Sequence, residues 1–83
     1  MIITDEARDM IKELLKQNQC NCIQVHVIQS CCSSSLEFEM IKTESKDIIM
    51  FNDIPFQMDF EARVMTKSKI IEIDKGELMI NNQ

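Results

Sequence analysis

The stretch Cys20–Met40, CNCIQVHVIQSCCSSSLEFEM, decides the fold because apolar and polar residues alternate along both of its halves. Every second residue of each half is apolar: Ile23, Val25 and Val27 in the first, and Leu36, Phe38 and Met40 in the second. A period of two is typical of β-strands with one buried face. Because Ser30–Ser35 is polar apart from its two cysteines, we predict two strands that flank a cysteine–serine loop.

On the N-terminal side of this stretch, apolar residues recur at intervals of three and four, which is the period of an amphipathic helix. They are Ala7, Met10, Ile11, Leu14 and Leu15. Thr4 can cap such a helix through its hydroxyl group, and Asp5 and Glu6 place negative charge at the positive end of the helix dipole. We therefore predict a helix over about residues 4–18.

On the C-terminal side, two apolar runs at residues 48–51 and 54–58 are separated by Asn52 and Asp53. This two-residue connection is typical of a β-hairpin turn. Pro55 has no backbone N–H group to donate to a neighbouring strand. We therefore expect the run that contains it to lie at a sheet edge or at a bulge.

The last third of the chain contains a short helix and a final pair of strands. Asp59 can cap a helix that runs through Met65. Two predicted strands, at residues 70–74 and 78–80, flank Gly76, which is free to take a positive φ. The resulting order of helix, four strands, helix and two strands differs from alternating βαβ units and predicts an α+β domain.

The composition restricts the classes of function. A chain of 83 residues has room for one domain, residues 1–83. The net charge of −5 and the absence of Trp and Tyr argue against a nucleic-acid partner. A single glycine excludes glycine-rich phosphate loops. No apolar run approaches the roughly 20 residues that cross a bilayer, and residues 1–6 lack a secretory signal, so we expect a cytoplasmic protein without membrane association.

Groups for catalysis are scarce. His26 is the only histidine, and it falls on the polar face of the first predicted strand, so we expect a solvated surface side chain. The carboxylates are placed on exposed helix turns and strand faces, and no Cys-x-x-Cys motif is present. We therefore predict that the protein is not an enzyme.

The four cysteines form two pairs, Cys20 with Cys22 and Cys31 with Cys32, at the two ends of the first predicted strand. At about 3.3 Å per residue, the strand separates the pairs by roughly 30 Å, so we expect no four-cysteine site within one chain and an incidental role for the first pair. A disulfide between neighbouring residues is disfavoured, because a trans peptide holds their Cα atoms only about 3.8 Å apart. Cys31 and Cys32 are then either free thiols without a chemical role or ligands of a soft metal centre such as iron.

Several short motifs that match the pattern of one protein family are spread along nearly the whole chain: Ile3–Ala7, Cys31–Leu36, Asn52–Phe56, Asp59–Ala62, Ile73–Asp74, Gly76 and Leu78–Asn82. Together they resemble the HesB-like, or A-type, iron–sulfur carrier proteins. The first motif is similar to the opening helix of that family, and the second to its first cysteine motif. The middle motifs look like its central strand and the helix that follows, and the last ones like its final strands.

The resemblance implies a small mixed β-sandwich or barrel-like domain with an N-terminal helix and a second short helix. It also implies a protein that binds iron or an iron–sulfur cluster and acts in cluster assembly or in delivery to recipient apo-proteins. The first cysteine ligand of the family corresponds to Cys31, with Cys32 as the adjacent alternative, and a homodimer would supply four thiolates.

The sequence also departs from the pattern of the family. No cysteine follows Cys32, whereas the family carries a Cys-x-Cys before its last strand, and serines replace the glycines around Cys31. The alternative interpretation is therefore a divergent HesB-like interaction module that has lost metal binding.

Overall fold

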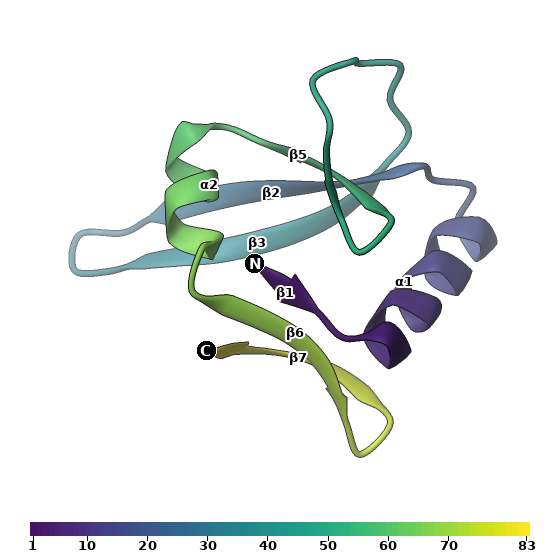
Figure 1. The fold of residues 1–83 in the computed structure, drawn as a ribbon. Helices are drawn as coiled ribbons and strands as arrows, with labels where there is room; N and C mark the ends of the chain where they lie inside the picture. The colour runs from purple at the N-terminus through teal and green to yellow at the C-terminus, as the bar shows by residue number, and fades with distance from the viewer.

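The structure, a computed structural model, describes residues 1–83 as two helices and two β-sheets (Figure 1). The elements in chain order are β1 (Ile2–Ile3), α1 (Asp5–Gln17), β2 (Cys22–Gln29), β3 (Ser34–Ile41), β4 (Ile49–Phe51), β5 (Ile54–Met58), α2 (Phe60–Thr66), β6 (Lys69–Asp74) and β7 (Glu77–Asn82). The predicted order of helix, four strands, helix and two strands is confirmed, and β1 precedes it as an additional strand.

The larger sheet has the strand order β3-β2-β5-β4. β2 and β3 form its longest pairing, an antiparallel hairpin whose register runs from Cys22 with Ile41 to Gln29 with Ser34. This confirms the two strands predicted around the cysteine–serine loop. On its other side, β2 pairs with β5 in the parallel direction, so the sheet is mixed.

Of the two positions predicted for the strand containing Pro55, a sheet edge or a bulge, the sheet edge is wrong. β5 lies inside the sheet, between β2 and β4. Its pairing with β2 begins at Phe56, so the missing N–H group of Pro55 falls outside that ladder of hydrogen bonds. The predicted hairpin turn at Asn52 and Asp53 is confirmed, and both residues have positive φ angles, 45° and 66°, as in a type I′ turn.

The smaller sheet has the order β1-β6-β7. β1 pairs with β6 in the parallel direction, with Ile2 beside Ile70 and Ile3 beside Ile71. β6 and β7 form an antiparallel hairpin that turns at Lys75 and Gly76. The φ angle of Gly76 is +79°, which confirms the predicted use of its conformational freedom.

Both helices begin where the capping residues predict. The hydroxyl of Thr4 accepts a hydrogen bond from the N–H group of Ala7 at 3.2 Å, and the carboxylate of Asp59 accepts one from the N–H group of Ala62 at 2.8 Å. Because Thr4 and Asn18 act as caps, α1 is one residue shorter at each end than predicted. Neither helix combines the length and the apolar character that a membrane crossing requires.

The core lies between the two sheets and takes side chains from both of them and from both helices. Its buried residues are Ile3, Ala7, Ile11, Leu15, Ile23, Val25, Ile54, Phe56, Met58, Ala62 and Ile71. The two sheets do not join into a closed barrel, so the expectation of a sandwich-like or barrel-like domain narrows to a mixed α+β arrangement of two sheets. Only 13 of the 83 residues are buried, so the free energy of unfolding rests on a small core.

Candidate functional site

The β2–β3 hairpin carries Cys31 and Cys32 at its tip, at the left end of the hairpin in Figure 1. The turn is closed by a hydrogen bond of 2.9 Å from the N–H group of Ser30 to the carbonyl of Ser33. The hydroxyl groups of the same two serines lie 3.1 Å apart, and that of Ser30 also contacts the Ser33 carbonyl at 3.2 Å. Serine is suited to such a turn because its hydroxyl forms local hydrogen bonds with the backbone. The two cysteines are therefore held as the central pair of a tight turn.

Both tip thiols are exposed, and their Sγ atoms lie 3.4 Å apart. Neither takes part in a disulfide. Two thiolates that bind one tetrahedral metal at about 2.3 Å each stand roughly 3.8 Å apart, which is within a few tenths of an ångström of the observed separation. The donor set of the tip therefore fits half of a tetrahedral thiolate site.

The other two cysteines lie at the opposite end of β2, about 26 Å away along an eight-residue strand. Cys22 is buried, and this burial raises the pKa of its thiol. Cys20 is half-buried, and its thiol lies 3.4 Å from the carbonyl of Asn18. The predicted separation of the two pairs is confirmed. No group of three or more His, Cys, Asp or Glu side chains in the chain is arranged to hold a metal ion.

His26 also lies where the strand pattern predicts, on the face of β2 that is turned away from the core. Its Nε2 atom stands 3.5 Å from a carboxylate oxygen of Glu39, and both side chains are in contact with solvent. His26 is half-buried and Glu39 is exposed, and they lie five residues before Cys31 and seven residues after Cys32. The expectation of a surface histidine is therefore confirmed.

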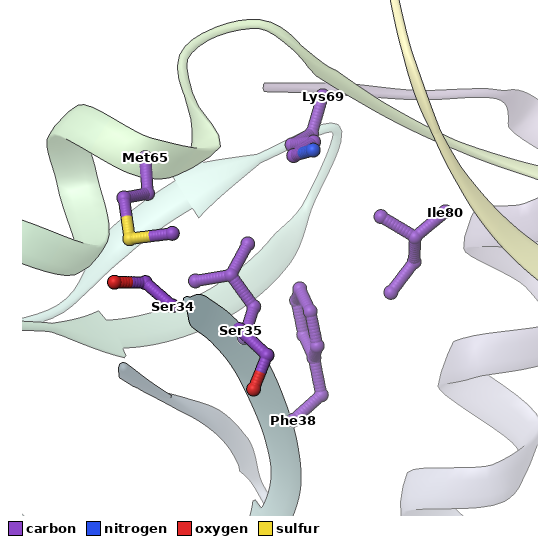
Figure 2. Close-up of a pocket in the computed structure, with 7 residues that line it drawn as sticks. Ser34, Ser35, Phe38, Met65, Lys69 and Ile80 are labelled. Atoms are coloured by element: carbon purple, nitrogen blue, oxygen red, sulfur yellow. The ribbon is translucent and has the colours of Figure 1, made fainter. Parts of the chain in front are cut away.

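A cleft next to the hairpin tip was not predicted. Its volume is about 240 Å³, and it is lined by Ser34, Ser35, Leu36, Phe38, Met65, Lys69 and Ile80. Figure 2 shows Phe38, Met65 and Ile80 reaching toward the same space from β3, α2 and β7. Sequence patterns miss this cleft because it depends on how far the two sheets diverge. Ser34 lines the cleft and follows Cys32 by two residues, so the tip and the cleft are neighbours.

Comparison with known proteins finds a similarity of fold. No family model matches the chain, and no curated protein matches its sequence. A protein from Aquifex aeolicus, solved by solution NMR in a structural genomics programme, has a similar fold with a TM-score of 0.54. The two are 17% identical, and the alignment covers 98% of this chain and 89% of the other. The likeness supports a small mixed α+β fold over the whole chain.

Proposed function

We propose that the protein is a HesB-like carrier that binds iron or an iron–sulfur cluster through Cys31 and Cys32, and acts in cluster assembly or delivery. The observation that carries this proposal is the pair of exposed thiols, 3.4 Å apart, at the tip of the β2–β3 hairpin. The thiolate is the sulfur ligand that iron and iron–sulfur clusters take in proteins.

The position of the pair suits a cargo that must be received and released. Thiols at a hairpin tip are open to solvent on several sides, whereas resident structural metal sites are usually closed by four ligands of one chain. One chain offers two thiolates at its tip, so a complete set of four requires two chains. The proposed site is therefore shared across a homodimer.

Two further observations support the proposal. The motifs that resemble the HesB-like family are spread over both sheets and both helices, and Cys31–Leu36 among them includes the tip itself. The fold likeness to the protein from Aquifex aeolicus extends over 98% of the chain and is compatible with one small domain of this kind.

The test is anaerobic reconstitution with ferrous iron and sulfide, followed by absorption spectroscopy and by iron and sulfide analysis. The wild-type protein should gain thiolate-to-iron charge-transfer bands, and the double variant Cys31→Ser, Cys32→Ser should lose them. The matched control is Cys20→Ser, which removes a partly accessible thiol at the other end of β2 and should leave the uptake unchanged. Equal uptake by the double variant and the wild type would contradict the proposal.

The second candidate is the interaction module without metal. It is favoured by the absence of a third ligand near the tip and by the cleft of about 240 Å³ beside it, which Phe38, Met65 and Ile80 line together with polar residues. This candidate predicts no stoichiometric iron in protein that is purified without oxygen. Bound iron that is lost when Cys31 is replaced by serine would contradict it.

A further inference from the structure

The two sheets leave an open seam, which is the space between the core-facing sides of β3 and β7. β3 is the outermost strand of the larger sheet and β7 is the outermost strand of the smaller one, so each has an edge that pairs with no other strand. The cleft beside the hairpin tip takes Leu36 and Phe38 from β3 and Ile80 from β7. The cleft therefore occupies one end of this seam.

A second pocket lies further along the seam, away from the tip. Its volume is about 170 Å³, and it is lined by Ile11, Leu14, Ile23, Phe38, Glu39, Met40 and Leu78. Moving away from the tip, β3 contributes Leu36, Phe38 and Met40, while β7 contributes first Ile80 and then Leu78. Phe38 lines both pockets, so the cleft and this inner pocket adjoin at its ring.

The two ends of the seam differ in charge. The end at the tip carries the ammonium group of Lys69 and the hydroxyl groups of Ser34 and Ser35, and Figure 2 shows Lys69 extending toward the cleft. Lys69 is half-buried and forms no ion pair, and its Nζ atom donates a hydrogen bond of 2.6 Å to the amide oxygen of Asn82. The only polar residue of the inner pocket is Glu39. The tip end therefore favours an anionic group, and the inner end repels one.

The size of the seam suits a thin apolar chain. The cleft, of about 240 Å³, is smaller than the roughly 300–1,000 Å³ of pockets that take drug-sized ligands, but the two pockets joined at Phe38 reach that range. A methylene group is about as large as a water molecule, which takes about 30 Å³. On this scale the cleft holds about eight such groups and the inner pocket about five.

We propose that the seam binds a fatty acid of about ten to twelve carbons. Its carboxylate lies at Lys69, within reach of the serine hydroxyls of β3, and its chain passes Phe38 into the inner pocket. The class of ligand follows from Lys69, because a neutral or cationic amphiphile leaves this ammonium group without a counter-ion. The orientation follows from Glu39, which repels a carboxylate at the inner end. The site uses none of the cysteines and is independent of the proposed function.

The methionines provide the measurement, because Met65 lines the cleft and Met40 lines the inner pocket. Metal-free protein with carbon-13 in its methionine methyl groups is titrated with sodium decanoate below its micelle concentration, and NMR spectra are recorded. The methyl resonances of Met65 and Met40 should shift together and give one dissociation constant. Met50 is 56% exposed on β4 and lines neither pocket, so its resonance should stay in place.

Lys69→Gln tests the charge, since it removes the ammonium group and keeps most of the side-chain length. It should raise the dissociation constant of decanoate about fivefold or more, and leave that of neutral decanol unchanged. The matched control is Lys75→Gln, which makes the same change of charge at the exposed turn between β6 and β7, and should leave both constants unchanged.

Ile80→Trp tests the path of the chain by filling the cleft. Ile80 is 42% exposed, so the larger side chain does not overpack the core. This substitution should weaken the binding of decanoate and of decanol alike.

Four outcomes would overturn the inference. The first is decanol that binds as tightly as decanoate, and the second is a Lys75→Gln effect as large as that of Lys69→Gln. The third is a Met50 resonance that shifts along with Met65, which would indicate adsorption to the whole surface. The fourth is that decanoate leaves Met65 and Met40 unmoved while a peptide of alternating apolar residues shifts the amide resonances of β3, which would make the seam a site for strand pairing.

Discussion

The two ends of β2 place the same residue type in opposite surroundings. At the first end, Cys22 is the first residue of β2 and is only 1% exposed, and burial raises the pKa of its thiol. At the other end, Cys31 and Cys32 are exposed on a two-residue tip with their sulfur atoms 3.4 Å apart. The comparison teaches that position along one strand, rather than the number of cysteines, decides which thiols are available for chemistry. Only the thiolate of an accessible cysteine is a ligand or a nucleophile.

The largest difference between the two ends should appear in alkylation rates. We expect iodoacetamide to modify Cys31 and Cys32 at least about 100-fold faster than Cys22 in the native protein, because Cys22 must first be exposed by unfolding. Mass spectrometry of peptides from a time course measures each rate. In urea the three rates should converge. A native Cys22 that reacts as fast as Cys31 would show that the buried end of β2 opens freely.

Serine substitutions should show the same contrast in stability. Cys22→Ser places a hydroxyl group in a buried position and should lower the free energy of unfolding by about 1–3 kcal/mol. Cys32→Ser changes an exposed side chain and should alter it by less than about 0.5 kcal/mol. Because the chain has no Trp or Tyr, urea unfolding is followed by far-UV circular dichroism. Equal effects at both positions would remove the distinction between the two ends.

The raised pKa of Cys22 predicts a pH dependence in one direction. In the unfolded chain this thiol loses its proton near its ordinary pKa of 9.0, whereas in the folded protein it keeps the proton to higher pH. The folded state then binds more protons, so the free energy of unfolding falls as the pH rises above that value, by at most about 1.4 kcal/mol per pH unit.

Urea midpoints between about pH 8 and about pH 10 measure this effect. In Cys22→Ala the fall over this range should be shallower than in the wild type. An identical slope in the two proteins would show that Cys22 does not contribute.

The smallest effect should come from the hydroxyl group that supports the tip. Ser30→Ala removes the exposed contacts of that hydroxyl with Ser33, and should lower the free energy of unfolding by about 0.5 kcal/mol or less. Ser68→Ala is the control, since the Ser68 side chain is exposed and forms no hydrogen bond. Urea unfolding of both variants gives the difference. A loss well above 1 kcal/mol would mean that the tip is more tightly coupled to the sheet than its exposure indicates.

The local patterns predicted most of the elements because each has a strong signal within a few residues. The alternation on both sides of the tip, and the caps at Thr4 and Asp59, are examples. β1 was missed because two residues carry no period. The interior position of β5 was missed because Pro55 constrains only its own N–H group, and the neighbouring strand pairs one residue later.

The candidate site was predictable in part. The exposure of Cys31 and Cys32 and their distance from Cys20 and Cys22 follow from strand geometry, which the sequence contains. The cleft and the exposed face of α2 do not follow from strand geometry. On α2, Phe60 and Val64 have the same residue types as core positions, so their exposure could not be predicted. Their exposure depends on which side of α2 faces the sheets, and this is decided by Ala62 and Thr66 through tertiary packing. The binding of a metal by Cys31 and Cys32 stays a prediction.

The parallel pairing of β1 with β6 has a consequence for how the chain folds. Ile2 lies beside Ile70, and the N–H group of Thr4 donates a hydrogen bond of 3.0 Å to the carbonyl of Ile71. β1 therefore cannot pair until β6 has been synthesised, whereas β2 and β3 are close in sequence and can pair early. Contacts between residues so far apart slow folding, because the long loop must close before they form. We therefore expect the β2–β3 hairpin, which carries the thiol tip, to pair before β1 and β6 do.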